Sequence, residues 1–336
     1  MLKRTILFSI LAVALAFALP VLLSAAPLGR TETEAAETPA PTEEPAAERV
    51  PVLDSALPLT VHTERGDVEM TMADYLPLAL AGEMPASFDA EALKAQAVAL
   101  RSYALYYRAH RKDNHPGADV CTSSGCCAAY ADSEQLRSNW GSNYDAYMAK
   151  LRAAVADTDG QYLVYDSSPI LAVFHSSSYR KTEDGTGVGL SVPYLVSVDT
   201  PETAAAVTNL NTTVEVSAGD FQATVLSSCP GAALDGDPSG WIGAVSLNAA
   251  GRVASVQIGG AAVSGLALRQ MFSLRSTDFT LAWDADGQNF VFRVSGYGHG
   301  VGMSQYGANL MAKAGADYAE ILAHYYRDTQ LVMALQ

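Results

Sequence analysis

The sequence predicts an α+β fold, with mixed helices and mainly antiparallel short strands behind an N-terminal membrane anchor. A helical pattern covers residues 89–111, and strand-like runs separated by Gly, Asn and Asp occupy residues 241–294. The chain lacks the repeating alternation of strands and helices that a doubly wound sheet requires. With 336 residues, 49% of them hydrophobic, it can bury one large core or two smaller ones.

The first 26 residues have the pattern of a membrane anchor. A basic n-region, residues 1–4, precedes an unbroken apolar or small stretch over residues 5–26. At about 1.5 Å per residue, a helix of this length crosses the roughly 30 Å hydrocarbon core. The basic residues favour a cytoplasmic N-terminus and an extracytoplasmic remainder. A cleaved signal peptide is the alternative, although Pro27 disfavours cleavage after Ala26.

Residues 27–51 are expected to form a disordered acidic stalk. Most of this stretch is rich in Pro, Thr, Glu and Ala and almost free of bulky apolar side chains, so it cannot bury enough surface to fold. Globular sequence begins near Val52, and residues 52–336 are expected to form the folded region. The net charge of −15, without any run of Lys or Arg, argues against nucleic acid as a partner.

The local patterns of the globular region predict its elements in order. Residues 59–70 form a hairpin with Gly66 and Asp67 near its turn. The helix over residues 89–111 has Asp89 as its N-cap, and apolar side chains recur at steps of three and four. The remaining expected elements are strands over 162–165 and 170–174, the strand series over 241–294 with a helix near 266–274, and two final helices after Gly302 and Asp317, the second opened by a capping box of Asp317 and Glu320.

A carboxylate lies just before the central helix, in the run Gly82-Glu83-Met84-Pro85. At the edge of a cleft, partial burial raises the pKa of such a group into the range of a general acid. Local sequence alone favours the plainer interpretation, in which Glu83 is a surface residue near a helix start.

Three further segments carry residues suited to chemistry. His115, Cys121 and Cys127 lie in a Gly- and Ser-rich loop, where they suit either zinc or, outside the reducing cytosol, a disulfide that involves Cys126 or Cys127. The polar run 174–183 can line a sugar site or form an ordinary loop. The glycine-dense run 296–307 allows close approach of backbone to a ligand, and its His299 is either a core or a cleft residue.

Taken in order, these segments resemble the stage II sporulation protein D family, which includes amidase-enhancer proteins. The resemblance extends from about Val52 to the C-terminus. It is carried by the runs Glu83-Met-Pro-Ala, Glu91-Ala-Leu-Lys-Ala-Gln-Ala-Val-Ala-Leu-Arg-Ser-Tyr-Ala, Phe174-His-Ser-Ser-Ser, Gly296-Tyr-Gly-His-Gly-Val-Gly-Met-Ser-Gln with Tyr306-Gly-Ala-Asn, and Ile321-Leu-Ala-His-Tyr-Tyr.

The resemblance implies a lytic transglycosylase that cleaves the β-1,4 bond between N-acetylmuramic acid and N-acetylglucosamine in peptidoglycan glycan strands during forespore engulfment. It implies Glu83 as the catalytic acid and base. It also implies a zinc ion on His115, Cys121 and Cys127, with Cys126 as the rival of Cys127, and we expect the metal to clamp the loop. The candidates for binding sugar are Ser176, Ser178, His299, Ser304 and Gln305. Gln96 and Arg101, inside the apolar helix, either brace the site or are plainly structural.

The resemblance also implies partners and a location. The partners are a sporulation amidase that strips stem peptides and a membrane scaffold protein, and the location is the intermembrane side of the sporulation septum. Two alternatives remain open at this point. One is a non-catalytic glycan-binding module that stimulates a cell-wall amidase, and the other is a zinc hydrolase that acts on wall peptides.

Overall fold

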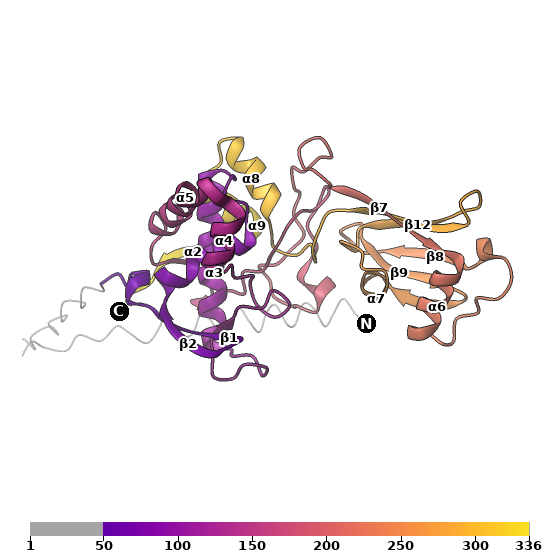
Figure 1. Ribbon diagram of the computed structural model, residues 1–336, viewed down its shortest axis with the longest axis horizontal. Helices are drawn as coiled ribbons and strands as arrows, with labels where there is room; N and C mark the ends of the chain where they lie inside the picture. Colours follow the sequence, from indigo (N-terminus) through magenta and orange to yellow (C-terminus); the bar gives the residue numbers. More distant parts are fainter. Residues whose placement is uncertain (1–49, 336) are drawn as a thin grey trace, which may run out of the picture. The chain divides into compact units, whose positions relative to one another are not determined.

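The computed structural model describes residues 50–335, which belong to one compact unit, Arg49–Gln336 (Figure 1). The predicted n-region (1–4), the predicted anchor (5–26) and the predicted stalk up to residue 49 lie outside these residues. Among residues 50–335, no helix combines the length and the apolar character needed to cross a membrane.

The described residues confirm an α+β fold with mainly antiparallel strands. The helices are α2 (Met72–Glu83), α3 (Ala90–Ala109), α4 (Ser133–Trp140), α5 (Tyr144–Ala156), α6 (Ala218–Ser228), α7 (Gly265–Met271), α8 (Gln305–Lys313) and α9 (Tyr318–Tyr325). The strands are β1 (Pro58–Thr63), β2 (Gly66–Thr71), β3 (Val120–Cys121), β4 (Gln161–Tyr165), β5 (Ser168–Pro169), β6 (Phe174–His175), β7 (Asn211–Ser217), β8 (Ile242–Leu247), β9 (Val253–Ile258), β10 (Ala261–Ser264), β11 (Phe279–Asp284), β12 (Asn289–Ser295), β13 (Met303–Ser304) and β14 (Gln330–Met333).

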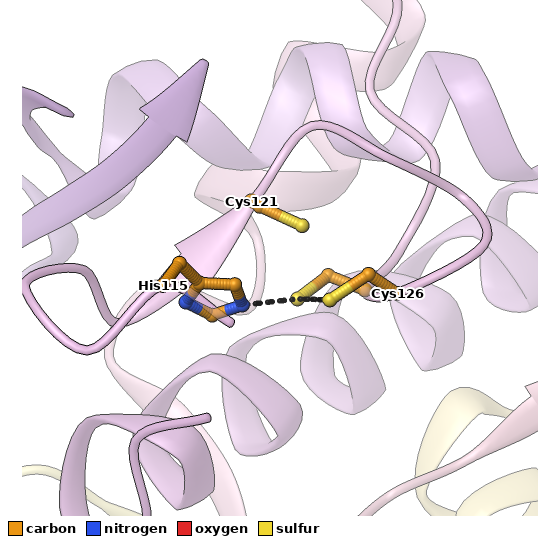
Figure 2. Close-up of side chains that lie close together, drawn as sticks. His115, Cys121 and Cys126 are labelled. Atoms are coloured by element: carbon orange, nitrogen blue, oxygen red, sulfur yellow. Dashed lines mark hydrogen bonds between the residues drawn. The ribbon is translucent and has the colours of Figure 1, made fainter. Parts of the chain in front are cut away.

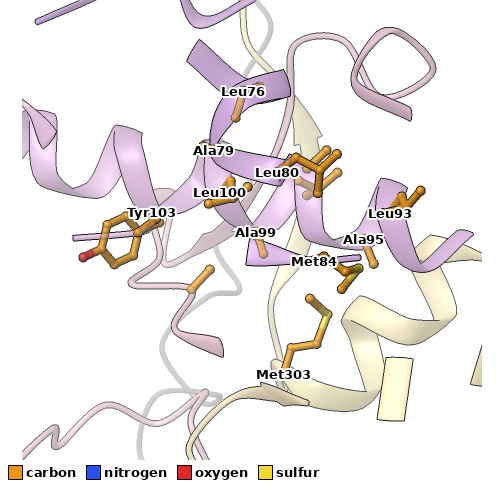
Figure 3. Close-up of a cluster of buried hydrophobic side chains, with 14 of the residues drawn as sticks. Leu76, Ala79, Leu80, Met84, Leu93, Ala95, Ala99, Leu100, Tyr103 and Met303 are labelled. Carbon is orange, nitrogen blue, oxygen red and sulfur yellow. The ribbon is translucent and has the colours of Figure 1, made fainter. Parts of the chain in front are cut away.

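Helix α3 lies at the centre of the first hydrophobic core. Every residue from Ala95 to Ala104 is buried, so this helix is covered on all sides rather than along one stripe. It packs against α2, α5, α8, α9 and β4, which brings the C-terminal helices beside the N-terminal ones. Figure 3 shows Leu76 and Leu80 of α2, Leu93 of α3 and Met303 of β13 as members of one buried cluster.

A buried ion pair anchors α3 to the chain that precedes it. The side chains of Arg101 and Asp54 are 0% and 2% exposed. Nε and Nη2 of Arg101 donate to the two carboxylate oxygens of Asp54, at 2.7 and 2.6 Å, and Nη1 donates to the carbonyl oxygen of Gln161 at 2.7 Å. The guanidinium is therefore paired in a two-pronged geometry that suits a buried charge, and Arg101 has a structural role.

The second hydrophobic core belongs to the strands between residues 211 and 295 and to helices α6 and α7. It contains two antiparallel sheets, with strand orders β11-β12-β7 and β10-β9-β8 (Figure 1). Phe221 of α6 stacks on Phe290 of β12 with ring centroids 3.9 Å apart, and Trp241 stacks on the same ring. These aromatic contacts explain how short strands with many exposed positions still enclose a core.

Most local predictions are confirmed. Strands β1 and β2 pair as a hairpin from Pro58↔Thr71 to Thr63↔Gly66, and Asp89 caps α3 by accepting from the amide of Glu91. The capping box of α9, with Asp317 and Glu320, is also present. The prediction of a strand over residues 170–174 was wrong, because only Phe174 of that run belongs to a strand, the two-residue β6. The amides of Ala172 and Val173 bond to carbonyls two residues back, which coils this apolar run instead of extending it.

Substitution of Asp54 by Asn is expected to lower the free energy of unfolding by about 3–5 kcal/mol, because it leaves the buried guanidinium of Arg101 without its counter-charge. Urea denaturation of residues 49–336 measures this change. The matched control is Asp67→Asn, since Asp67 pairs with His62 at an exposed position and is expected to cost less than about 1 kcal/mol. Equal losses in the two variants would contradict the anchoring role of the buried pair.

Candidate active site

A cavity of about 520 Å³ lies where four segments meet. These are the end of α2, the loop before α4, the polar run 174–183 and the glycine-dense run 296–307. Its size falls within the range of small-ligand sites. The residues around it are Gly82, Glu83, Tyr103, Ser124, Cys127, Ala128, Ala129, Val173, Phe174, His175, Ser176, Tyr297, Gly298, His299 and Gln305. Glu83 is the sole carboxylate among these described lining residues. Of the predicted site residues, Glu83, Ser176, His299, Gln305 and Cys127 therefore lie around one cavity.

Glu83 is the last residue of α2, a helix that the sequence analysis did not predict. Its Oε1 accepts a hydrogen bond from the backbone amide of Ala129, and its Oε2 accepts one from Nε2 of Gln305 at 3.4 Å. Burial raises the pKa of Glu83 above its usual value, while the bonds from Ala129 and Gln305 act in the opposite direction. The carboxyl group is thus partly desolvated but retains two donors for its charged form.

Close backbone packing fixes the direction in which Glu83 points. A Cβ added to Gly82 would lie 2.9 Å from the carbonyl carbon and 3.0 Å from the carbonyl oxygen of Ala129. Only glycine allows α2 to approach the 127–130 segment this closely. The same approach brings the Ala129 amide within reach of the Glu83 carboxylate.

Gln305, the first residue of α8, is supported from behind by α3. The Nε2 group of Gln305 lies 3.5 Å from Oε1 of the fully buried Gln96, so one amide contacts both Glu83 and Gln96. Of the two polar residues inside the apolar helix, Gln96 therefore contacts the site through Gln305, whereas Arg101 does not reach it.

Ser176, from the polar run 174–183, and His299, from the glycine-dense run 296–307, both line the cavity. Nδ1 of His299 accepts from the amide of Val301 at 3.1 Å. Burial, together with the nearby charge of Arg269, lowers the pKa of His299 to about 4. The imidazole is therefore neutral near pH 7 and can form polar contacts without adding positive charge to the cavity.

Ser178 and Ser304 lie behind the cavity wall rather than in it. Both are 0% exposed. The hydroxyl of Ser178 contacts His175 and Arg252, and the hydroxyl of Ser304 bonds to Glu202 and accepts from the amide of Gly307 at the start of α8. Their position supports the wall and gives them no described contact with the cavity.

Among the lining residues that the sequence analysis did not name as site residues, those with aromatic rings are Tyr103, Phe174, His175 and Tyr297. Tyr103 sits near the end of the buried stretch of α3, and Tyr297 lies inside the glycine run with 48% of its surface exposed. His175 had the clearest signal, since it follows an apolar run and opens a polar one. The contacts that hold the His175 ring in the cavity wall include Val301, which is distant in the sequence, so local patterns do not reveal them.

The glycine run is shaped by the segment that it crosses. Gly298 has φ of +112°, and a Cβ there would lie 2.8 Å from Cβ of His175. At Gly302, with φ of +69°, a Cβ would lie 2.0 Å from the carbonyl oxygen of Val173. Side chains at these positions would push the glycine-dense run away from residues 173–175. Glycine thus allows residues 296–304 to run directly against residues 173–177, with β13 and β6 paired in parallel.

A second polar cluster lies beside the cavity and could hold a metal ion. The nearest ligand atoms of His115, Cys121, Cys126 and Cys127 all lie within 4.8 Å of one another. Figure 2 shows His115, Cys121 and Cys126 around a common point, with β3 positioning Cys121. Nε2 of His115 is 3.4 Å from Sγ of Cys127, and the sulfurs of Cys126 and Cys127 are 3.8 Å apart.

This geometry suits a tetrahedral metal better than a disulfide. Two sulfurs bound at about 2.3 Å in a tetrahedral zinc site are roughly 3.8 Å apart, whereas a disulfide requires about 2.05 Å. All four cysteines of the chain are free thiols in the structure. The sequence left Cys126 and Cys127 as rivals for one ligand position, and the structure brings both to the cluster.

The candidate metal cluster and the cavity share one loop. Cys127 belongs to the cluster and also lines the cavity, and Ala129, two residues later, donates its amide to Glu83. An ion bound to the cluster would therefore restrain the backbone that holds the carboxylate.

Comparisons with known proteins identify the family of this chain. The family model described as Stage II sporulation protein matches residues 65–165, which include Glu83 and the metal cluster. The chain is 34% identical to Stage II sporulation protein D of Bacillus subtilis over 263 residues, which cover 77% of this chain and 74% of the relative. It is also 34% identical to the protein of that name from Bacillus amyloliquefaciens, with the same shares covered, and 28% identical to an Amidase enhancer of Bacillus subtilis, over 74% of this chain and 39% of that protein.

Substitution of Gly82 by Ala is expected to push α2 away from the Ala129 segment, costing about 1–3 kcal/mol of folding free energy. It is also expected to raise the pKa of Glu83, because the carboxylate loses the Ala129 amide. Carbon-13 NMR titration of the Glu83 side chain and urea unfolding measure the two effects. The control is Gly219→Ala in α6, where an added Cβ meets nothing within 4 Å. An unchanged Glu83 pKa in folded Gly82→Ala would show that this packing does not position the amide.

Proposed function

Because the chain belongs to the stage II sporulation protein D family, we propose that it is a lytic transglycosylase of bacterial cell wall. The substrate is the β-1,4 bond between N-acetylmuramic acid and N-acetylglucosamine in glycan strands, which we expect to be stripped of peptides. The observation that carries this proposal is that Glu83 is the only carboxylate among the described residues that line the cavity. Hydrolytic glycosidases generally place two carboxylates across the scissile bond.

A single carboxyl group can serve both halves of the reaction. Glu83 first donates its proton to the leaving glycosidic oxygen as the bond to the anomeric carbon breaks. The C6 hydroxyl of the same muramic acid residue then attacks that carbon, and Glu83, now a carboxylate, accepts the hydroxyl proton. The product is a 1,6-anhydro end, and no water is consumed. The raised pKa of Glu83 supports this sequence, because the acid must be protonated at the start.

The two cavity histidines are suited to an oxocarbenium-like transition state because both are neutral. Burial lowers the pKa of His299 to about 4 and lowers the pKa of His175 well below its usual value. Neither ring would add a positive charge where the sugar becomes positive. Neither ring is a proton donor near pH 7, which leaves Glu83 as the acid. Ser176 and Gln305 are placed to contact sugar hydroxyl groups.

Zinc fits the cluster of His115, Cys121, Cys126 and Cys127, which offers three sulfurs and one nitrogen. A site with four protein ligands is closed, as in structural zinc sites, whereas catalytic sites keep one position open. The ion would supply a cross-link of the 115–127 loop. The chain's own residues would still carry the proton transfers, with Ala129 holding Glu83 in place.

The proposal extends to location and partners. The pattern of residues 1–26 supports a membrane-anchored protein whose working region lies outside the cytoplasm, on the intermembrane side of the sporulation septum. The similarity to an Amidase enhancer supports a partnership with a cell-wall amidase. We expect a membrane scaffold protein to hold the two together.

Glu83→Gln is expected to lower cleavage of peptide-free glycan strands by at least about 100-fold, because it removes the acid and base while keeping the shape. Mass spectrometry of the products measures this and also identifies the chemistry. The wild-type protein is expected to give ends lighter by one water than hydrolytic ends. Its rate is expected to fall as pH rises through the raised pKa of Glu83, since the protonated form starts the reaction.

The control is Glu64→Gln, at an exposed position in the hairpin turn, which is expected to keep full activity. Ordinary reducing ends would identify a hydrolase instead. Intact strand binding without any cleavage would favour the non-catalytic module that stimulates an amidase.

Purified protein is expected to bind one zinc ion per chain through the His115 and cysteine cluster. Elemental analysis of wild type and Cys121→Ser measures the stoichiometry, and Cys229→Ser, outside the cluster, is the control. Free metal at about 100-fold over its Kd should add about 3 kcal/mol of stability. Chelation is expected to speed hydrogen exchange at the Ala129 amide. A metal-free wild-type protein two mass units lighter under non-reducing conditions would indicate the disulfide instead.

A further inference from the structure

Arg252, which directly precedes β9, is a buried arginine that the proposed chemistry does not use. Its side chain is 1% exposed. Nη2 donates to the hydroxyl of Ser178 at 2.9 Å, while Nε and Nη1 have no hydrogen-bond partner among the described residues. The nearest carboxylate, that of Glu183, lies 3.8 Å from Nε. Arg101, by comparison, places three nitrogens in hydrogen bonds of 2.6–2.7 Å.

This difference indicates that a gain in folding stability does not explain why Arg252 is buried. A buried charge is stabilising only when its geometry and remaining donors are well satisfied, and unsatisfied buried groups call for a specific reason. The packing around the guanidinium is nevertheless tight. A Cβ added to Gly300 would lie 2.6 Å from both Cζ and Nη2 of Arg252, so the glycine run leaves room for this side chain.

A chain of hydrogen bonds leads from Arg252 to the cavity wall. The hydroxyl of Ser178 accepts from Arg252 and lies 2.5 Å from Nε2 of His175. Nδ1 of His175 lies 3.1 Å from the carbonyl oxygen of Val301. That carbonyl can only accept, so Nδ1 carries a proton, and in the neutral ring Nε2 accepts the proton of Ser178. The donor and acceptor of each hydrogen bond are then fixed: Arg252 donates to Ser178, Ser178 donates to Nε2 of His175, and Nδ1 of His175 donates to Val301.

We propose that Arg252 is a positioning residue that acts through Ser178 to hold His175 as a neutral, Nδ1-protonated imidazole in the cavity wall. The relevance to catalysis rests on the proposed transglycosylase function. Both ring nitrogens are occupied, so the ring offers the sugar its carbon edges and its π-face. A neutral π-face beside an oxocarbenium-like centre is attractive, whereas a protonated ring would repel it.

The surroundings of His175 favour this neutral form from several elements. Burial, His299 and Arg252 all lower the pKa of His175, and the bond to Val301 acts in the opposite direction. The charged or titratable groups around the ring are His299, at 5.8 Å between ring centroids, Arg252 before β9, Glu202 on the amide of Ser178, and Glu83 across the cavity. Around Arg252 itself lie Glu183, Asp278 and Arg269, and the charge of Arg269 also acts on His299. Removing Arg252 takes away the cation that bonds to Ser178, while Arg269 stays in place.

Arg252→Met is expected to release the Ser178 hydroxyl, which can then accept a proton from Nε2 of His175. The pKa of His175 is expected to rise, and the preference for its Nδ1-protonated tautomer, which the Val301 carbonyl still supports, is expected to weaken. Nitrogen-15 NMR of the histidine rings in substrate-free protein measures both changes. On glycan strands, kcat is expected to fall about tenfold at neutral pH with KM changed less than about twofold. The loss is expected to grow as pH falls, because more of the His175 ring becomes protonated.

Three further variants keep the test decisive. Ser178→Ala leaves Arg252 in place and is expected to weaken the preference for the Nδ1-protonated tautomer in the same way, so it decides the matter where Arg252→Met does not fold. Arg252→Lys keeps the cation and is expected to restore part of the activity. Arg293→Met, at an exposed position of β12, is the control and is expected to change neither signal.

An unchanged His175 tautomer and pKa in folded Arg252→Met and Ser178→Ala would overturn the proposal, even where the melting temperature falls. The NMR arm needs no substrate. A wild-type protein that fails to cleave strands would therefore remove the proposed function, while the spectra would still decide whether Arg252 positions His175.

Discussion

The burial of α3 on every side is the constraint from which the described fold follows. Ten consecutive residues, Ala95 to Ala104, have no face toward solvent, so the chain must surround this helix with elements from both of its ends. Small alanine side chains allow that close approach, and the pair of Arg101 with Asp54 satisfies the one charge enclosed with them. A helix with a single apolar stripe could not have packed against α2, α5, α8 and α9 together.

The cavity is a consequence of this enclosure. Because α2 and α8 both pack on α3, the end of one and the start of the other meet, and Glu83 and Gln305 come from these two ends. Gln96, fully buried in α3, links the scaffold to both. The glycines then set how closely the remaining segments approach: Gly82 admits the Ala129 backbone, and Gly298 admits His175. The position of Glu83 in the cavity is thus set largely by close backbone contacts.

The sequence predicts what local rules control and misses what distant contacts decide. The hairpin, α3, α7 and the capping box of α9 follow from patterns within a few residues, and they were predicted. Helix α2 was missed because Pro77 lies inside it, and proline disfavours a helix interior; its buried packing against α3 outweighs that cost. The 170–173 run is apolar enough for a strand but coils through local hydrogen bonds. The family motifs located Glu83, Ser176, His299 and Gln305, yet nothing near His175 in the sequence points to Arg252, 77 positions further on.

The metal cluster and the cavity around Glu83 differ in the side chains that they offer, and this difference suits them to different roles. Four ligands that close around one ion leave it no free position, so a metal there can organise the loop but not bind substrate. Under the proposed function, acid and base chemistry falls to Glu83, the one carboxyl group among the described residues that line the cavity. The surrounding groups must then keep Glu83 protonated without acting as acids themselves. Neutral histidines meet this requirement, and a buried arginine behind them makes their protonation harder. In the proposed mechanism, the positive charge of Arg252 therefore acts without touching the sugar: from behind the cavity wall it keeps His175 neutral, and a neutral ring does not oppose a positively charged transition state.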